Sequence, residues 1–195
     1  GFTSGSDFFD NSIAGIISPS YGKFAYDAKP FFTLSGNNRT AKHGGTYFNS
    51  IADLTLNGTG LQKITQLISV TNAINEAGLE VQLMPNVLLC QFGSDVWYTA
   101  KRLLESTGDA DSVHAGIKNI HMGALKLIGW RFLTDSNAFY VGIAKRGLKS
   151  LARKEPVIDF YEDKSIDSQV VRMRARWGRA VLNFRPWAAA NISTS

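Results

Sequence analysis

The chain has 195 residues, of which 44% are hydrophobic and 19% are charged. This apolar fraction excludes a disordered chain, and the length can bury one sizeable core, or one core plus a small lobe. The net charge of +5 permits contact with nucleic acid but does not require it, because the positive charge is spread along the chain. The single cysteine, Cys90, excludes an intrachain disulfide.

Two further features of the composition bear on where the protein works. No apolar run approaches the roughly 18 residues of a membrane span, and the first ten residues, GFTSGSDFFD, lack the basic and apolar regions of a signal peptide. These observations predict a soluble intracellular protein. The sparse charge and the 18 glycines predict many turns and a surface partly covered by other subunits.

The N-terminal part of the chain predicts one helix and one loop. Ser18-Pro19 is typical of a helix start, and Pro30 predicts that this helix kinks or ends near Lys29. Residues 35–50 are polar and turn-rich, which predicts a solvated loop that carries His43. Residues 51–56 predict a short extended piece, because the turn dipeptide Asn57-Gly58 follows them.

The clearest helix comes next. Thr59 and Gln62 have the spacing of a capping box, and Gly78 stands where a C-terminal cap would be expected. An apolar stripe at helical spacing lies between them and consists of Leu61, Ile64, Leu67, Ile68, Thr71 and Ile74.

A strand followed by a helix is predicted in the middle of the chain. The run Val87–Phe92 is apolar nearly throughout, which is typical of a fully buried strand. Ser94 and Asp95 then predict the N-terminus of a helix over Asp95–Glu105, with Val96, Ala100, Leu103 and Leu104 on its inner face. This order is the local unit of an α/β or α+β layer.

More strands are predicted after residue 121. Two lie at about Ala124–Leu133 and Ala138–Ile143, and a turn joins them. Lys145–Lys154 is rich in lysine and arginine and predicts a basic connector. Pro156–Tyr161 predicts another strand, and Glu162-Asp163-Lys164 a charged turn.

The stretch Gln169–Trp187 predicts a closing pair of strands. From Val171 to Trp177 the residues alternate, so Val171, Met173, Ala175 and Trp177 face one way and Arg172, Arg174 and Arg176 the other. This pattern predicts one buried face. Gly178 predicts a bulge or bend before a second run, Ala180–Phe184, which Arg185-Pro186 ends.

The charges of this region are the candidate interaction residues. The candidates are Arg172, Arg174, Arg176, Arg179, Arg185, Asp159, Glu162 and Asp163. The interpretation that the sequence favours is ion pairing within the chain or across a subunit boundary. A solvated face with weak ion pairs is the second interpretation. Contact of the arginines with phosphates is the third.

The sequence contains no constellation typical of a catalytic site. There is no GxSxG, P-loop, HExxH or helix-opening GxGxxG, and the pair His114 and His121 is a weak signal for a metal. Cys90 lies in an apolar strand, where a thiol is expected to be buried and unreactive. The aromatic residues Phe92, Trp97, Trp130, Phe132, Phe139, Tyr140 and Phe160 are explained by core packing. No enzyme activity, cofactor or metal is therefore expected.

Four stretches of the chain resemble a known family. They are KHGGTYFNSIADLTLNGTGLQKITQLI, LMPNVLLCQFGSDVWYTAKRLLES, ALKLIGWRFLTDSNAF and SQVVRMRARWGRAVLNFRPWAAAN. In their order they resemble the major capsid (major head) proteins of tailed bacteriophages, which have the Hong Kong 97 fold, and most closely the Mu-like major head subunits. The resemblance covers about 160 residues, although its motifs are loose.

The resemblance implies an α+β fold with a mixed-sheet A-domain and a P-domain that contains the closing strands. It places an N-terminal segment and the end of a spine helix at 1–35, the A-domain at 36–165, and the closing strand pair with a C-terminal tail at 166–195.

The function implied is a structural protein that self-assembles through pentamers and hexamers into an icosahedral head around phage DNA. Further expected partners are the packaged DNA, bound without sequence specificity, and a portal, scaffold or decoration protein. No membrane partner is expected. The expected location is the virion, after assembly in the host cytoplasm. The alternatives are an encapsulin-like shell protein and a basic nucleic-acid-binding domain with no role in assembly.

Overall fold

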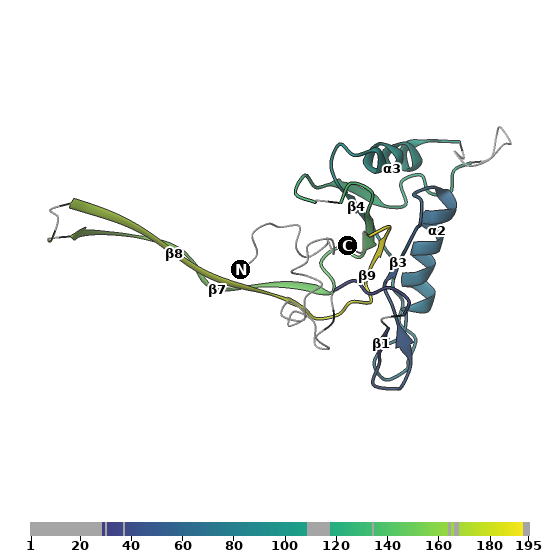
Figure 1. Cartoon of the computed structure of the whole chain (residues 1–195), viewed down its shortest axis with the longest axis horizontal. Coiled ribbons are helices and arrows are strands. Elements are labelled where there is room, and N and C mark those ends of the chain that lie inside the picture. Colours follow the sequence, from purple (N-terminus) through teal and green to yellow (C-terminus); the bar gives the residue numbers. More distant parts are fainter. Residues whose placement is uncertain are drawn as a thin grey trace.

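The computed structural model describes residues 29, 31–36, 38–108, 118–133, 135–163, 165 and 168–192. In this part of the chain the fold is α+β: two α-helices and a π-helical turn lie with a mixed five-stranded sheet in a body, and a two-stranded arm leaves that body (Figure 1). The elements are β1 (Arg39–Thr40), β2 (Thr46–Tyr47), β3 (Ser50–Ile51), α2 (Gly58–Gln66), η3 (Leu67–Thr71), β4 (Val87–Cys90), α3 (Asp95–Glu105), β5 (Lys126–Gly129), β6 (Phe139–Gly142), β7 (Leu148–Asp163), β8 (Ser168–Val181) and β9 (Trp187–Ala190).

The five-stranded sheet has the order β3-β9-β6-β4-β5. β6 is antiparallel to both of its neighbours, whereas β5 is parallel to β4 and β3 is parallel to β9. The three central strands are buried along their whole length, because apolar clusters cover both faces of the sheet. One cluster contains residues of α2 and α3, and the other contains Phe31, Phe32 and Phe184.

The strand and helix predicted in the middle of the chain are confirmed. β4 lies within the predicted run, and α3 has the predicted bounds. The Ser94 Oγ atom accepts a hydrogen bond from the Trp97 backbone N–H at 3.2 Å, as an N-cap does. β5 and β6 are also present, although both are shorter than predicted.

The helix predicted after residue 58 is present with different ends. Asn57, and not Thr59, is the N-cap, because its Oδ1 atom accepts from the Gly60 N–H at 2.6 Å. Gly60 packs closely against the chain before the helix. Any side chain at this position would clash, because its Cβ atom would lie 2.1 Å from the Thr55 carbonyl oxygen. The helical path ends at η3, and Gly78 lies beyond it in a turn with φ of +83°.

The largest differences from prediction concern the arm. The predicted basic connector at Lys145–Lys154 is wrong from Leu148 onward, because β7 begins there. The predicted break at Gly178 is also wrong, since β8 continues to Val181 and Ala180–Phe184 is not a separate strand. β7 and β8 pair antiparallel over 13 registered positions, with irregularities between Ala152 and Val157. At about 3.3 Å per residue, the 16 residues of β7 span about 50 Å.

The final strand, β9, was not predicted. It follows Pro186 directly and is a central strand, paired with β3 on one side and β6 on the other. Asn49 ties it to the rest of the body: this fully buried amide donates to the carbonyl oxygens of Phe31 and Trp187, each at 3.1 Å. The C-terminal segment therefore belongs to the body.

The domain boundaries predicted after residues 35 and 165 remain predictions. The boundary between 165 and 166 falls where the chain turns between β7 and β8, so the two paired strands lie on opposite sides of it. The helix predicted from Ser18 to near Lys29 lies almost wholly outside the described residues, and residues 31–36 contain no helix.

Candidate functional site

The arm, defined as β7 and β8, has two chemically different faces. Residues directly opposite each other in an antiparallel pair lie on the same face, and the next pair along lies on the other. Ile158 pairs with Met173 and Phe160 with Val171, and these four residues form the apolar face. Arg172, Arg174, Arg176 and Lys154 lie on the other side, which is here called the basic face. The predicted alternation of apolar and basic residues along β8 is thus confirmed.

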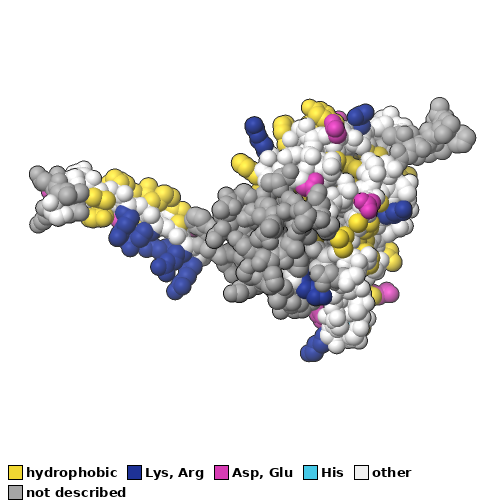
Figure 2. Space-filling view, in the orientation of Figure 1, with side chains coloured by type: hydrophobic (Ala, Val, Ile, Leu, Met, Phe, Trp, Pro, Cys, Tyr) yellow, Lys and Arg dark blue, Asp and Glu magenta, His cyan; other side chains and the backbone are white. Residues whose placement is uncertain are grey.

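The apolar face is open to solvent. The exposed fractions are 55% for Ile158, 77% for Phe160, 61% for Val171 and 65% for Met173. Figure 2 shows hydrophobic side chains along one side of the arm and lysines and arginines along the other. The prediction that Val171 and Met173 lie on a buried face is therefore wrong for the single chain, because the arm extends away from the described body and no layer of described residues covers these side chains.

Three aromatic residues assigned to the core are also exposed. Besides Phe160, these are Phe92, which is 57% exposed, and Phe132, which is 64% exposed, whereas Phe139 and Tyr140 are buried as predicted. Ile158 and Phe160 were not predicted as part of an interaction surface. The run from Val157 to Tyr161 is apolar except for Asp159, so its sequence does not divide it into two faces; the pairing with β8 does.

One carboxylate neutralises part of the basic face. Asp159 accepts from the Arg174 Nε–H at 3.0 Å and also pairs with its Nη2 atom. This hydrogen bonding lowers the pKa of Asp159, and the nearby charges of Arg174, Arg172 and Lys154 lower it further. The Arg172 guanidinium stacks over the Tyr161 ring, with its Cζ atom 5.5 Å from the ring centroid. Pairing of these arginines within the chain, as the sequence suggested, thus occurs at Arg174.

The positive charge in the middle of the arm is less well balanced. Lys154 and Arg176 are directly opposite each other across the two strands, and both are exposed. The ion pairs among the described residues join Arg174 to Asp159 and Arg185 to Glu76, so neither Lys154 nor Arg176 forms one there, although the charge of Lys154 acts on Asp159 from a greater distance. Like charges placed directly opposite each other destabilise a strand pair.

Arg185 is buried in the body and paired there. It is only 3% exposed, and its Nη2 atom donates to the Glu76 Oε1 atom at 2.7 Å. Its Cζ atom lies 4.6 Å from the centroid of Tyr47 and 5.3 Å from that of Phe184. The prediction that Arg185 faces DNA or a neighbouring subunit is therefore wrong, because aromatic rings enclose the guanidinium and Glu76 pairs with it.

A cavity of about 530 Å³ adjoins this ion pair. Its walls include Ile74, Val81, Leu83 and Leu182, and the polar residues at its margin are Lys42, Asn75, Glu76, Asn183 and Arg185. The hydrogen bond from Arg185, together with one from the Lys42 backbone N–H, lowers the pKa of Glu76. Glu76 and Arg185 are thus paired with each other at the cavity, while the Arg185 Nη1 atom is buried there without a hydrogen-bond partner.

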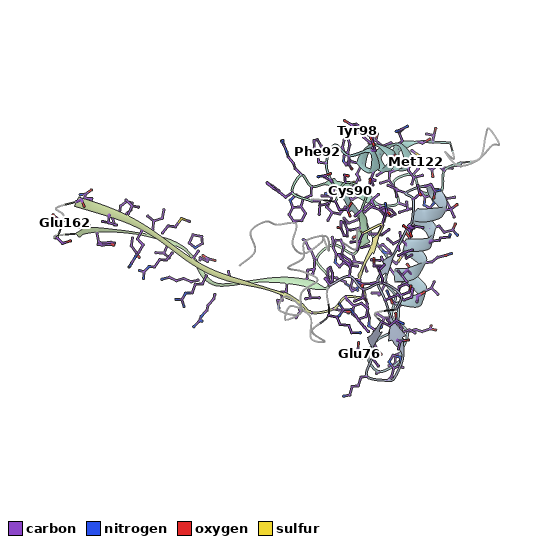
Figure 3. All side chains as sticks on the ribbon, in the orientation of Figure 1. Glu76, Cys90, Phe92, Tyr98, Met122 and Glu162 are labelled. Carbon is purple, nitrogen blue, oxygen red and sulfur yellow. The ribbon has the colours of Figure 1, made fainter. Side chains whose placement is uncertain are left out.

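The remaining candidate residues lie along the arm. Glu162 is exposed at the far end, well separated from Glu76 on the body (Figure 3). Asp163 is the last residue of β7 and Arg179 lies in β8, but their side chains are outside the described part of the structure. The structure thus brings Asp159 together with Arg172 and Arg174, and it separates Arg185 from them.

The described residues offer little for catalysis. Among them no group of three or more His, Cys, Asp or Glu side chains is placed to hold a metal ion, and His114 lies outside this part of the chain. His43 shares a hydrogen bond of 2.9 Å with the Tyr47 hydroxyl. Burial raises the pKa of the Cys90 thiol to about 12, so it is protonated and a poor nucleophile at neutral pH.

Comparison of the chain with protein-family models and with curated proteins finds no match. In the described part of the chain, no helix has both the length and the apolar character needed to cross a bilayer. The functional argument therefore depends on the arm.

Proposed function

We propose that this protein is a structural subunit that assembles with copies of itself into an icosahedral shell, as the major capsid proteins of tailed phages do. The observation that carries the proposal is the exposed apolar face of the arm. A two-stranded hairpin alone in water is marginally stable at best, so a long arm with one apolar face needs a surface to cover it. The arm points away from the described part of its own body, so a second copy of the chain is the surface that the proposal places against it (Figure 1).

The dimensions of the arm support contact between copies. Its length of about 50 Å exceeds the diameter of about 38 Å expected for a compact domain of roughly 150 residues. One arm can therefore lie across the whole body of a neighbour. Full burial of the four large side chains of the apolar face would contribute on the order of 6 kcal/mol, given their present exposure. That is enough to strengthen an assembly in which each subunit makes several contacts.

The described body is α+β and contains a mixed sheet, which is the fold class expected of a Hong Kong 97-like protein. The Hong Kong 97 fold itself is part of this proposal. An encapsulin-like shell would use the same architecture. The second candidate function is a nucleic-acid-binding domain with no role in assembly, and the basic face of the arm is the observation that favours it.

The test is negative-stain electron microscopy of the purified protein, combined with light scattering over a wide concentration range. A shell subunit gives closed particles, or pentamer and hexamer rings, whose mass is a multiple of 21.4 kDa. A strict monomer at all concentrations would contradict the proposal. If that monomer bound DNA tightly, the second candidate function would replace it.

A further inference from the structure

The cavity beside the ion pair of Glu76 and Arg185 has the size and composition of a ligand site. Its volume of about 530 Å³ lies within the range of roughly 300–1,000 Å³ that is typical of small-molecule sites. Three segments that are far apart in the sequence form it. Its apolar walls come from Ile74, Val81, Leu83 and Leu182. We propose that this cavity binds a small aliphatic carboxylate, whose acid group pairs with Arg185 and whose chain lies against the apolar walls.

The Arg185 guanidinium supplies the first observation that points to an anionic ligand. Its side chain is only 4% exposed, and its Nη1 atom has no hydrogen-bond partner among the described residues. Glu76 pairs with the other terminal nitrogen, Nη2, through its Oε1 atom at 2.7 Å. A buried donor without a partner is costly, whereas one carboxylate can accept from two nitrogens of a guanidinium at once. A ligand carboxylate can therefore satisfy both terminal nitrogens of Arg185.

The position of the guanidinium is fixed, whereas Glu76 is free to move. The Arg185 Cζ atom lies 4.6 Å from the centroid of the Tyr47 ring and 5.3 Å from that of Phe184. These rings limit the motion of the guanidinium, so little conformational freedom is lost when it binds a ligand. The Glu76 side chain is 50% exposed, and the Nη1 atom is covered in the free chain. We expect the Glu76 carboxylate to turn toward solvent as the ligand enters, which uncovers this nitrogen.

The charges at the cavity favour a ligand with a single negative charge. Among the described residues that line it, Lys42 and Arg185 are cations and Glu76 is a carboxylate, which leaves one positive charge in excess. The aliphatic walls disfavour a ligand that is polar over its whole length, because its polar groups would lose water without finding partners. An aliphatic chain with one carboxylate fits both conditions.

An apolar side chain of another protein explains the cavity less well. Val81 and Leu182 are 38% and 62% exposed, so such a side chain could cover them. It would leave the Arg185 Nη1 atom without an acceptor in a site from which it has also excluded water. The carboxylate ligand covers the same walls and supplies the acceptor.

This inference concerns the body and goes beyond the proposed shell, because it depends neither on the arm nor on assembly. Either can fail while the other holds. Its test uses the full chain with the substitutions Phe160→Ser and Val171→Ser, which lie at the centre of the apolar face of the arm. They remove a second apolar surface to which an aliphatic probe could adhere, and they keep subunit contacts out of the measurement.

The experiment is a titration of this isotope-labelled protein with sodium octanoate at pH 7, followed by the amide chemical shifts of the cavity residues. The matched neutral probe is 1-octanol, which has the same aliphatic chain and no charge. We expect octanoate to shift the amide signals of Ile74, Leu83 and Leu182. It should bind about 10–100-fold more tightly than octanol, as a hydrogen-bonded charge does.

Two variants separate the charged groups from the apolar walls. Glu76→Gln removes the competing carboxylate, so octanoate should bind about 3–10-fold more tightly and octanol with unchanged affinity. Arg185→Gln should abolish the preference for octanoate over octanol. The matched control for Glu76→Gln is Glu105→Gln, which should leave both affinities unchanged, because Glu105 ends α3 and does not line the cavity.

Three results would overturn the inference. The first is the absence of octanoate binding at the cavity residues. The second is equal affinity for octanol and octanoate, because the cavity is then an apolar recess that suits a side chain of another protein. The third is an octanoate affinity that Glu76→Gln does not raise. If circular dichroism shows that Arg185→Gln is unfolded, the two probes and the Glu76→Gln variant decide the question without it.

Discussion

Replacement of Asn49 by alanine tests how the body is held together. Asn49 is fully buried, and its side chain makes three well-formed hydrogen bonds to the main chain. Its Nδ2 atom donates to the carbonyl oxygens of Phe31 and Trp187, and its Oδ1 atom accepts from the Thr33 N–H at 2.9 Å. The alanine variant removes this partner from the Thr33 N–H and the Trp187 carbonyl oxygen, whereas the Phe31 carbonyl oxygen still accepts from the Arg39 Nη2 atom at 3.2 Å.

The size of the effect follows from the burial of these groups. A buried polar group that loses its partner costs about 1–3 kcal/mol, and neighbouring losses are not fully additive. We therefore expect Asn49→Ala to lower the free energy of unfolding by about 2–4 kcal/mol, which is a large part of the 5–15 kcal/mol typical of a domain. With a urea dependence of about 2 kcal/mol per molar, the midpoint falls by about 1–2 M.

The assay is urea unfolding followed by tryptophan fluorescence, in the Phe160→Ser/Val171→Ser background so that subunit contacts do not add to stability. Asn137→Ala is the control, because Asn137 is exposed, and it should shift the midpoint by less than about 0.3 M. A loss of under about 1 kcal/mol for Asn49→Ala would refute the reasoning, since solvent or a rearranged chain would then satisfy the Thr33 N–H and the Trp187 carbonyl oxygen.

Three further predictions concern the body. Gly142→Ala should lower the unfolding free energy by about 1–3 kcal/mol in the same assay, because the new Cβ would lie 2.4 Å from the Trp187 ring; an unchanged midpoint would contradict this. Arg185 keeps the pKa of Glu76 below its ordinary value of 4.5, so the stability from this pair is present above that pH and is lost as the pH falls through the lowered value. In urea unfolding measured from pH 6 to pH 3, the midpoint of the Glu76→Gln variant should fall less with decreasing pH than that of the wild type. The same pH dependence in both proteins would show that the ion pair does not contribute to stability. Cys90, whose pKa is raised to about 12, should react with a thiol reagent at pH 8 only after unfolding, and rapid labelling of the native protein would show that it is accessible.

Local signals explain which elements could be predicted. β4 is a continuous apolar run, and α3 has Ser94 as its cap and three buried side chains on one face, so each element carries its own signal. β9 carries no such signal, because Trp187-Ala-Ala-Ala follows a proline and alanine has a low strand propensity. Its strand conformation depends on β3 and β6, which are far away in sequence and enclose it.

The arm shows a different limit of sequence reasoning. Alternation along β8 predicted two faces, but the covering of a face depends on where the rest of the chain lies. The lysines and arginines of Lys145–Lys154 predicted a basic connector, and strands of a buried sheet rarely carry so many charges. In an arm that is surrounded by solvent, charged residues and strand structure are compatible, so β7 could form there.

The measurement that tests the central claim most directly compares assembly of the wild-type protein with that of the Phe160→Ser/Val171→Ser variant. The control is Phe132→Ser/Val70→Ser, which replaces the same residue types at positions on the body that are 64% and 68% exposed. We predict closed particles or rings for the wild type and the control, and folded monomers of about 21 kDa for the arm variant. Particles formed equally well by the arm variant would show that the apolar face of the arm does not join the subunits.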